Sequence, residues 1–150
     1  MESVPGFLVD AHVRDERADD LDALIRSLFA RRHLRTAGSG QQQMWMVAEF
    51  IQQMRARSAV FKALSTKMDG PIPFGIGHCT IKDGAVEQVA RPLPLEHPNV
   101  FARVLSEFVA PGAVCGVEPE NEAPYGWRID GVDELTALDE HALRSYRASA

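Results

Sequence analysis

The dipeptide Asp83-Gly84 constrains the fold more than any other part of this sequence. It separates two runs of residues that favour β-strands, 77–82 and 85–90. Asp-Gly is typical of a two-residue type I′ turn, in which both central residues take positive φ angles. The sequence therefore predicts a β-hairpin with a defined register, in which Thr80 lies opposite Glu87.

The two faces of this hairpin differ in polarity, because successive side chains of a strand point to opposite sides. One face carries Cys79, Ile81 and Val86, with Gln88 as its polar residue. The other face is mostly polar and carries His78, Thr80, Lys82 and Glu87. We expect the first face to pack in the core and the second to meet solvent or a ligand.

Hydrophobic periodicity predicts the remaining elements. They are a strand at 7–13, helices at 15–36 and 41–68, an extended link at 91–94, a helix near 98–109, a hairpin of 114–118 with 125–130, and a helix over 136–148. Ser58 is suited to cap a second, shorter helix within 41–68, and one long helix is the alternative. Thr136 and Asp139 resemble a capping box at the start of the last helix.

This order of elements indicates an α+β fold in a single domain, 1–150. Hairpins imply antiparallel pairing, so we expect an antiparallel sheet of about four or five strands, with helices packed on one face. Two hairpins and the N-terminal strand supply these strands. Trp127 shares a face with Ile129 and is expected in the core against the 98–109 helix, so that Trp127→Ala costs about 3–5 kcal/mol.

Charge and composition limit the classes of partner. The formal net charge is -5 and the pI about 5.5, whereas binding to nucleic acid or to an anionic membrane needs a basic field. The basic cluster 31–35 is explained by its place at the end of a helix. No apolar run approaches the roughly 20 residues that span a bilayer, and the N-terminus lacks the pattern of a signal peptide. We expect a soluble, cytoplasmic protein.

The two cysteines, Cys79 and Cys115, both lie in predicted strands. Their burial as small apolar residues is the simpler interpretation, and it suits a reducing compartment. A disulfide between them remains open if their strands are adjacent. In the predicted register Cys79 points to the apolar face, where a thiolate is disfavoured and a nucleophilic role is unfavourable.

Sequence motifs for catalysis are lacking, but one polar group on the first hairpin suits acid–base chemistry. His78 and Glu87 are diagonal neighbours, with Thr80 beside them, and a carboxylate next to an imidazole orients a general base. A solvated polar face is the alternative. Asp10 and His12 share a strand face but supply too few ligands for a metal site. We therefore predict neither a metal nor a cofactor.

Two segments suit the binding of a macromolecule. Trp45 lies among polar neighbours on the 41–68 helix, next to Met46, and both residue types are enriched at interface cores. Coverage of Trp45 by the C-terminal tail is the alternative, and self-association would satisfy the same argument. The connection between the strands of the second hairpin is acidic, with Glu118, Glu120 and Glu122 at alternating positions, and is either a solvated loop or a contact for a basic partner.

These observations favour a small acidic binding or regulatory protein of the inhibitor or immunity type, which acts through another protein or through self-association. The alternative is a small enzyme that uses His78 and Glu87 on the polar face of the sheet. A deep pocket over that face would favour the enzyme. A flat polar face together with an exposed aromatic patch would favour the binding protein.

Overall fold

The first hairpin forms as its sequence predicts. The computed structural model describes residues 3–34, 40–65 and 71–148, without the side chains of 29–34 and 40–47. Strand β2 (Cys79–Lys82) pairs with β3 (Ala85–Gln88), and Thr80 lies opposite Glu87. Asp83 and Gly84 have φ angles of 52° and 76°, as a type I′ turn requires. The local turn signal therefore determines the register.

A valine at Gly84 tests this turn. Gly84→Val is expected to lower the free energy of unfolding by about 1–2 kcal/mol, because a β-branched residue is strained at positive φ. No atom lies within 4 Å of the position of the added Cβ, so strain and not collision causes the loss. Urea denaturation measures it, and Asp83→Asn is the control, since asparagine tolerates this conformation. An unchanged midpoint for Gly84→Val would contradict the turn assignment.

The main sheet is antiparallel and has the strand order β4-β1-β5-β6-β7 in the described residues. Its strands are β1 (Val4–Val9), β4 (Leu93–Leu95), β5 (Val114–Val117), β6 (Tyr125–Gly131) and β7 (Glu134–Leu138). The β2–β3 hairpin is a separate two-stranded sheet. The fold is the expected single α+β domain, with a five-stranded main sheet across the described ranges.

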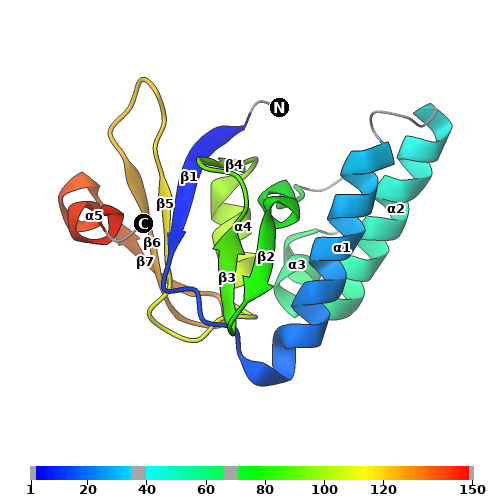
Figure 1. Ribbon diagram of the computed structural model, residues 1–150, viewed down its shortest axis with the longest axis horizontal. Coiled ribbons are helices and arrows are strands. Elements are labelled where there is room, and N and C mark those ends of the chain that lie inside the picture. The colour runs from blue at the N-terminus through cyan, green and yellow to red at the C-terminus, as the bar shows by residue number, and fades with distance from the viewer. Residues whose placement is uncertain (1–2, 35–39, 66–70, 149–150) are drawn as a thin grey trace.

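The helices cover both faces of this sheet. They are α1 (Ala18–Leu34), α2 (Gly40–Arg57), α3 (Ala59–Leu64), α4 (Pro98–Leu105) and α5 (Glu140–Arg147). Figure 1 shows the layers from left to right: α5, the main sheet, α4 with the hairpin, and the group α1 to α3. One large core lies between the main sheet and helices α1 to α4, and a smaller cluster lies under α5. The expectation of helices on one face only is therefore wrong for α5, because β1 and β5 are apolar on the opposite face as well and pack there against Leu143 of α5.

Three boundaries differ from the sequence prediction. The N-terminal strand ends at Val9, because Asp10 takes a φ of 54° and breaks the alternation. The link after the hairpin contains β4, which pairs with β1. The predicted helix over 136–148 is wrong at its start: 134–138 is strand β7, and Asp139 caps α5 by accepting a hydrogen bond from Ala142 N–H at 2.8 Å.

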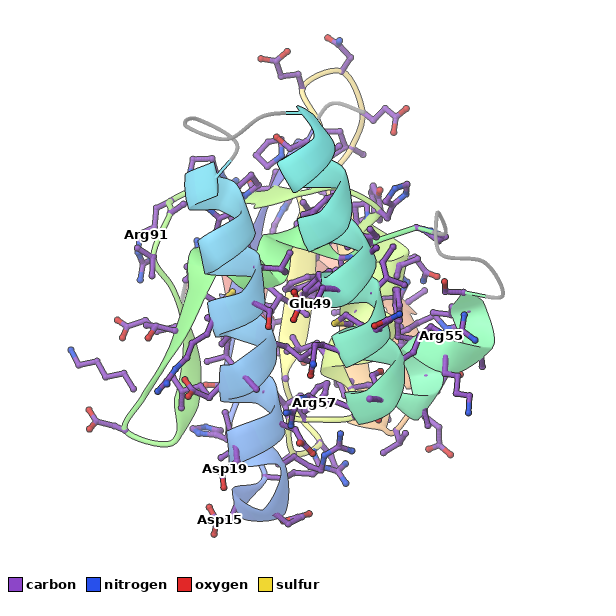
Figure 2. The ribbon with its side chains drawn as sticks, turned by 90° about the vertical axis from the view of Figure 1, so that its right-hand side faces the viewer. Asp15, Asp19, Glu49, Arg55, Arg57 and Arg91 are labelled. Carbon is purple, nitrogen blue, oxygen red and sulfur yellow. The ribbon has the colours of Figure 1, made fainter. Side chains whose placement is uncertain are left out.

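Helices α2 and α3 are separate, as the cap at Ser58 predicted, and the alternative of one long helix is wrong. The Ser58 hydroxyl accepts a hydrogen bond from Phe61 N–H at 3.0 Å. Figure 2, which looks onto α1 and α2, places Arg57 between these two helices, and its guanidinium lies 2.7 Å from the Asp20 carboxylate. Ion pairing therefore joins the end of α2 to the start of α1.

Gln88 explains how the hairpin joins the main sheet. Its side-chain oxygen accepts a hydrogen bond from Leu8 N–H at 3.0 Å. Further along the chain from Leu8, Ala11 O accepts a hydrogen bond from Val86 N–H at 2.7 Å. Strand β4 pairs with the first half of β1, and β3 thus follows the same edge of β1 beyond β4. The polar residue on the apolar face of the hairpin thus satisfies a backbone group of β1.

Candidate functional site

The polar face of the hairpin faces solvent. Thr80 and Glu87 are exposed, while His78 is half-buried at the end of the 3₁₀ turn that precedes β2. A cavity of about 390 Å³ lies between the hairpin and α1, and Thr80 belongs to its lining whereas His78 and Glu87 do not. The acid–base role of His78 with Glu87 stays a prediction.

Both cysteines are buried free thiols. Burial raises the pKa of Cys79 to about 12. Burial also raises the pKa of Cys115 to about 12, with a smaller contribution from Cys79. The Cys79 thiol donates to Gly75 O at 3.5 Å. Cys79 therefore lies on the apolar face, as the register predicted, and its thiol stays protonated near neutral pH.

Alkylation tests this protonation state. At about pH 8, a thiol with a pKa of about 12 is ionised in only about one molecule in ten thousand, and the thiolate is the reactive form. We expect iodoacetamide to leave both cysteines unmodified in the native protein and to modify both in urea, as read by mass spectrometry. Rapid modification of Cys79 in the folded protein would contradict its burial.

Asp10 and His12 are both exposed, and the backbone of His12 forms a bridge to Ala85. In the part of the chain that the structure describes, no three His, Cys, Asp or Glu side chains gather closely enough to hold a metal ion. A search of the same part finds no helix that is long and apolar enough to cross a membrane.

The acidic connection joins β5 to β6 and projects beyond the end of the sheet (Figure 1). Glu118 is tied to the fold, because its carboxylate lies 2.8 Å from the guanidinium of Arg147 on α5. Glu120 and Glu122 are exposed. The three glutamates thus divide into one structural ion pair and two carboxylates that face solvent.

An aromatic pair follows this loop on β6. The rings of Tyr125 and Trp127 lie edge to face, with centroids 5.6 Å apart. Partial burial raises the pKa of Tyr125, and the neighbouring Glu122 carboxylate raises it further. Tyr125 is 36% exposed, so an aromatic surface lies directly beside the acidic loop.

Trp127 lies on the predicted face of β6 but is only half-buried. It borders an open cavity of about 410 Å³ between α4 and the outer strands of the sheet. The lining consists of Asn99, Arg103, Trp127, Asp133, Leu135 and Ala137. Helix α4 covers the centre of the sheet and leaves this part of β6 and β7 open.

The partial exposure of Trp127 lowers the expected cost of its removal. We now expect Trp127→Ala to lower the free energy of unfolding by about 1–3 kcal/mol, below the range for a fully buried aromatic residue. Urea denaturation checks this, with the fully buried Phe101 as the comparison, for which Phe101→Ala should cost about 3–5 kcal/mol. Equal losses of unfolding free energy for the two variants would contradict the partial exposure of Trp127.

An ion pair fixes the wall of this cavity. Arg103 Nε and Nη2 lie 2.7 and 3.0 Å from the two carboxylate oxygens of Asp133, and this bidentate bond holds the pKa of Asp133 below its usual value. Asp133 N–H donates to the Ser106 hydroxyl at 2.7 Å. The β6–β7 turn is thereby attached to α4, so the cavity has a defined shape.

Sequence reasoning missed this cavity because residues 136–138 of β7 were assigned to a helix. One local signal was present: Leu135 and Ala137 alternate with polar residues after the turn at Asp133, where φ is 55°. Trp45 and Met46 lie on α2, but their side chains are outside the described residues, and their role at an interface stays a prediction.

The comparisons with protein families, with curated proteins and with solved structures found no match for this chain.

Proposed function

We propose that this chain is a protein-binding domain of the inhibitor or immunity type, and that it recognises a basic partner. The contact surface consists of Tyr125, Trp127, Leu135 and Ala137 on the sheet, with the acidic loop beside them; we call it the β6–β7 surface. The open aromatic pair is the observation that carries the proposal, since tryptophan and tyrosine are enriched among the residues that dominate binding energy.

The shape of this surface supports a macromolecular partner. The cavity beside Trp127 is open, and its lining combines apolar side chains of β7 with the Arg103–Asp133 ion pair. A side chain of a partner that enters this space would cover Trp127 and Leu135 and remove their apolar surface from water. A polar rim around an apolar centre is the usual composition of such a contact.

Charge supports a basic partner. The chain carries a formal net charge of -5. Across the described residues, neither Glu120 nor Glu122 takes part in an ion pair within the fold. Of these two carboxylates, Glu122 is close enough to Tyr125 to raise its pKa, and a lysine or arginine of the partner would meet both without displacing an internal ion pair. Such complementarity mainly accelerates association and selects the partner.

A selection from a random-peptide phage library tests the proposal. We expect the recovered peptides to combine lysine or arginine with a large apolar residue, and their affinity to fall as salt is raised. The double variant Glu120→Lys with Glu122→Lys should lower the affinity for the best synthetic peptide by about tenfold or more. Trp127→Ala should weaken it to a similar degree.

The matched control reverses two exposed carboxylates elsewhere, Glu49→Lys with Glu87→Lys, and changes the net charge by the same amount. Figure 2 shows Glu49 on α2, on the opposite side of the molecule from β6 in Figure 1. If both double variants lower the affinity for the peptide equally, only net charge matters and the assigned surface is wrong. If no peptide is enriched, the binding proposal itself fails.

A further inference from the structure

The two edges of the main sheet differ in how they are protected. Strand β4 is three residues long and contains Pro94, and Gln88 and β3 continue its coverage of β1. Short length and proline are common means of preventing edge-to-edge pairing. Strand β7 has neither proline nor lysine, and at five residues it is longer. One edge is therefore covered, whereas β7 has neither short length nor proline to protect its backbone.

The backbone direction of β7 follows from the hydrogen bonds of β6. Ile129 directs both its N–H and its C=O to the β5 side, donating to Ala113 O and accepting from Gly112 N–H, each at 2.8 Å. Alternation along an antiparallel strand then directs the backbone groups of Arg128 to β7, where Thr136 is its partner. Consequently Leu135 and Ala137 direct their N–H and C=O groups outward.

No described residue provides a backbone partner for these outward groups. The side chains of Leu135 and Ala137 line the cavity beside Trp127. A strand added to β7 would therefore form main-chain hydrogen bonds at the same residues whose side chains border the cavity. Its own inward side chain would lie on the cavity side of the sheet, because paired residues share a face.

Charge selects the occupant of this edge. Exposed carboxylates flank β7 at both ends: Glu134 at its start, and Asp139 and Glu140 after its end. Antiparallel pairing of two copies about Thr136 would place Glu134 of one copy opposite Leu138 of the other, next to that copy's Asp139. This repulsion would occur twice, between chains that are each net acidic, and it disfavours self-pairing.

We propose that an extended, lysine- or arginine-bearing segment of the partner adds to β7 as a further strand of the sheet and places an apolar side chain in the cavity beside Trp127. This proposal rests on the function proposed above and specifies how the partner binds. Main-chain hydrogen bonds supply affinity in this mode, and the alternate side chains supply specificity.

A proline at Ala137 tests the edge. Ala137→Pro removes an outward N–H and no hydrogen bond to β6, so proline is tolerated there. We expect it to weaken binding of the best selected synthetic peptide by about tenfold or more. Ala137→Ser is the matched comparison: it changes the same side chain but keeps the N–H, so it should weaken binding of the peptide much less than the proline does. Circular dichroism verifies that both variants fold.

N-methylation of single residues in the same peptide provides a test without any change to the protein. A paired strand loses affinity at every second residue, because alternate N–H groups point toward β7. If binding depends on Glu120 and Glu122 but shows neither this alternation nor an effect of Ala137→Pro, strand addition is overturned and the proposed function remains intact. Dimerisation of the wild type that Ala137→Pro abolishes would assign the edge to a second copy and overturn the proposal.

Discussion

Replacing Glu107 with alanine is expected to lower the free energy of unfolding by about 3–5 kcal/mol. The Glu107 side chain is 4% exposed and follows the end of α4. Its Oε1 accepts from the Ser58 hydroxyl at 2.7 Å and from Val60 N–H at 2.5 Å. Its Oε2 accepts from Ala59 N–H and from Arg17 Nη1, each at 3.3 Å. One buried carboxylate thus joins the start of α3 to the residues before α1.

Alanine would leave these donors without their acceptor. Arg17 also lies over the Phe108 ring at 4.5 Å, and its Nε is 3.5 Å from an Asp20 carboxylate oxygen but forms no hydrogen bond. Loss of Glu107 removes the more buried of the two carboxylates that pair with the Arg17 guanidinium, and it leaves the buried donors at the start of α3 without an acceptor. The loss should therefore exceed that of an ordinary hydrogen bond.

Urea denaturation of three variants separates the contributions. Glu107→Gln keeps an acceptor for Ser58 and Val60 but removes the charge, so we expect an intermediate loss. Glu87→Ala removes an exposed glutamate and should change the free energy of unfolding by about 0.5 kcal/mol or less. If Glu107→Ala unfolds at the wild-type urea concentration, this carboxylate does not hold the helical layer.

Replacing Gly126 with alanine is expected to cost about 3 kcal/mol, at the upper end of the range for overpacking. Gly126 on β6 lies opposite Gly116 on β5, which in turn lies opposite Phe7 on β1. An added Cβ at Gly126 would lie 2.2 Å from the backbone oxygen of Cys115 and 3.0 Å from Gly116 Cα. Because these are backbone atoms, the strands themselves would have to separate.

The neighbouring glycine offers a matched comparison. A Cβ at Gly116 would lie 2.2 Å from Cζ of the Phe7 ring, which is a side-chain atom. Phe7→Leu should therefore restore part of the stability that Gly116→Ala loses, but none of the stability that Gly126→Ala loses. Thermal denaturation of the single and double variants measures both couplings. Rescue of Gly126→Ala by Phe7→Leu would show that the ring, and not the backbone contact, limits this site.

Local signals were sufficient for the elements whose conformation depends on adjacent residues. The pair Asp83-Gly84 determined the turn and the register of the first hairpin, and the face of Cys79 followed from it. Ser58 marked the break between α2 and α3. The alternation that ends in Trp127 and Ile129 placed both residues on the face of α4. Each of these depends on φ preferences or on the periodicity of nearby side chains.

The candidate site depended on local sequence signals and also on tertiary pairing. The acidic loop was evident from Glu118, Glu120 and Glu122, and its position between two strands was predicted correctly. The assignment of 136–148 to one helix was wrong, because Thr136 and Asp139 have the spacing of a capping box. Asp139 instead begins the helix, and pairing with β6 makes 134–138 a strand. Without β7, neither the cavity nor the free edge could be inferred.

The sequence by itself determined the α+β class, the first hairpin and the second hairpin, because turns and side-chain alternation are short-range properties. Only the tertiary structure decided that Glu107 caps α3 across 47 residues, that Gln88 reaches Leu8 across 80 residues, and that α4 leaves Trp127 half open. Such contacts join segments distant in the chain, and their stability depends on burial and on the pairing of polar groups in the folded protein. No short stretch of sequence contains both partners of such a contact.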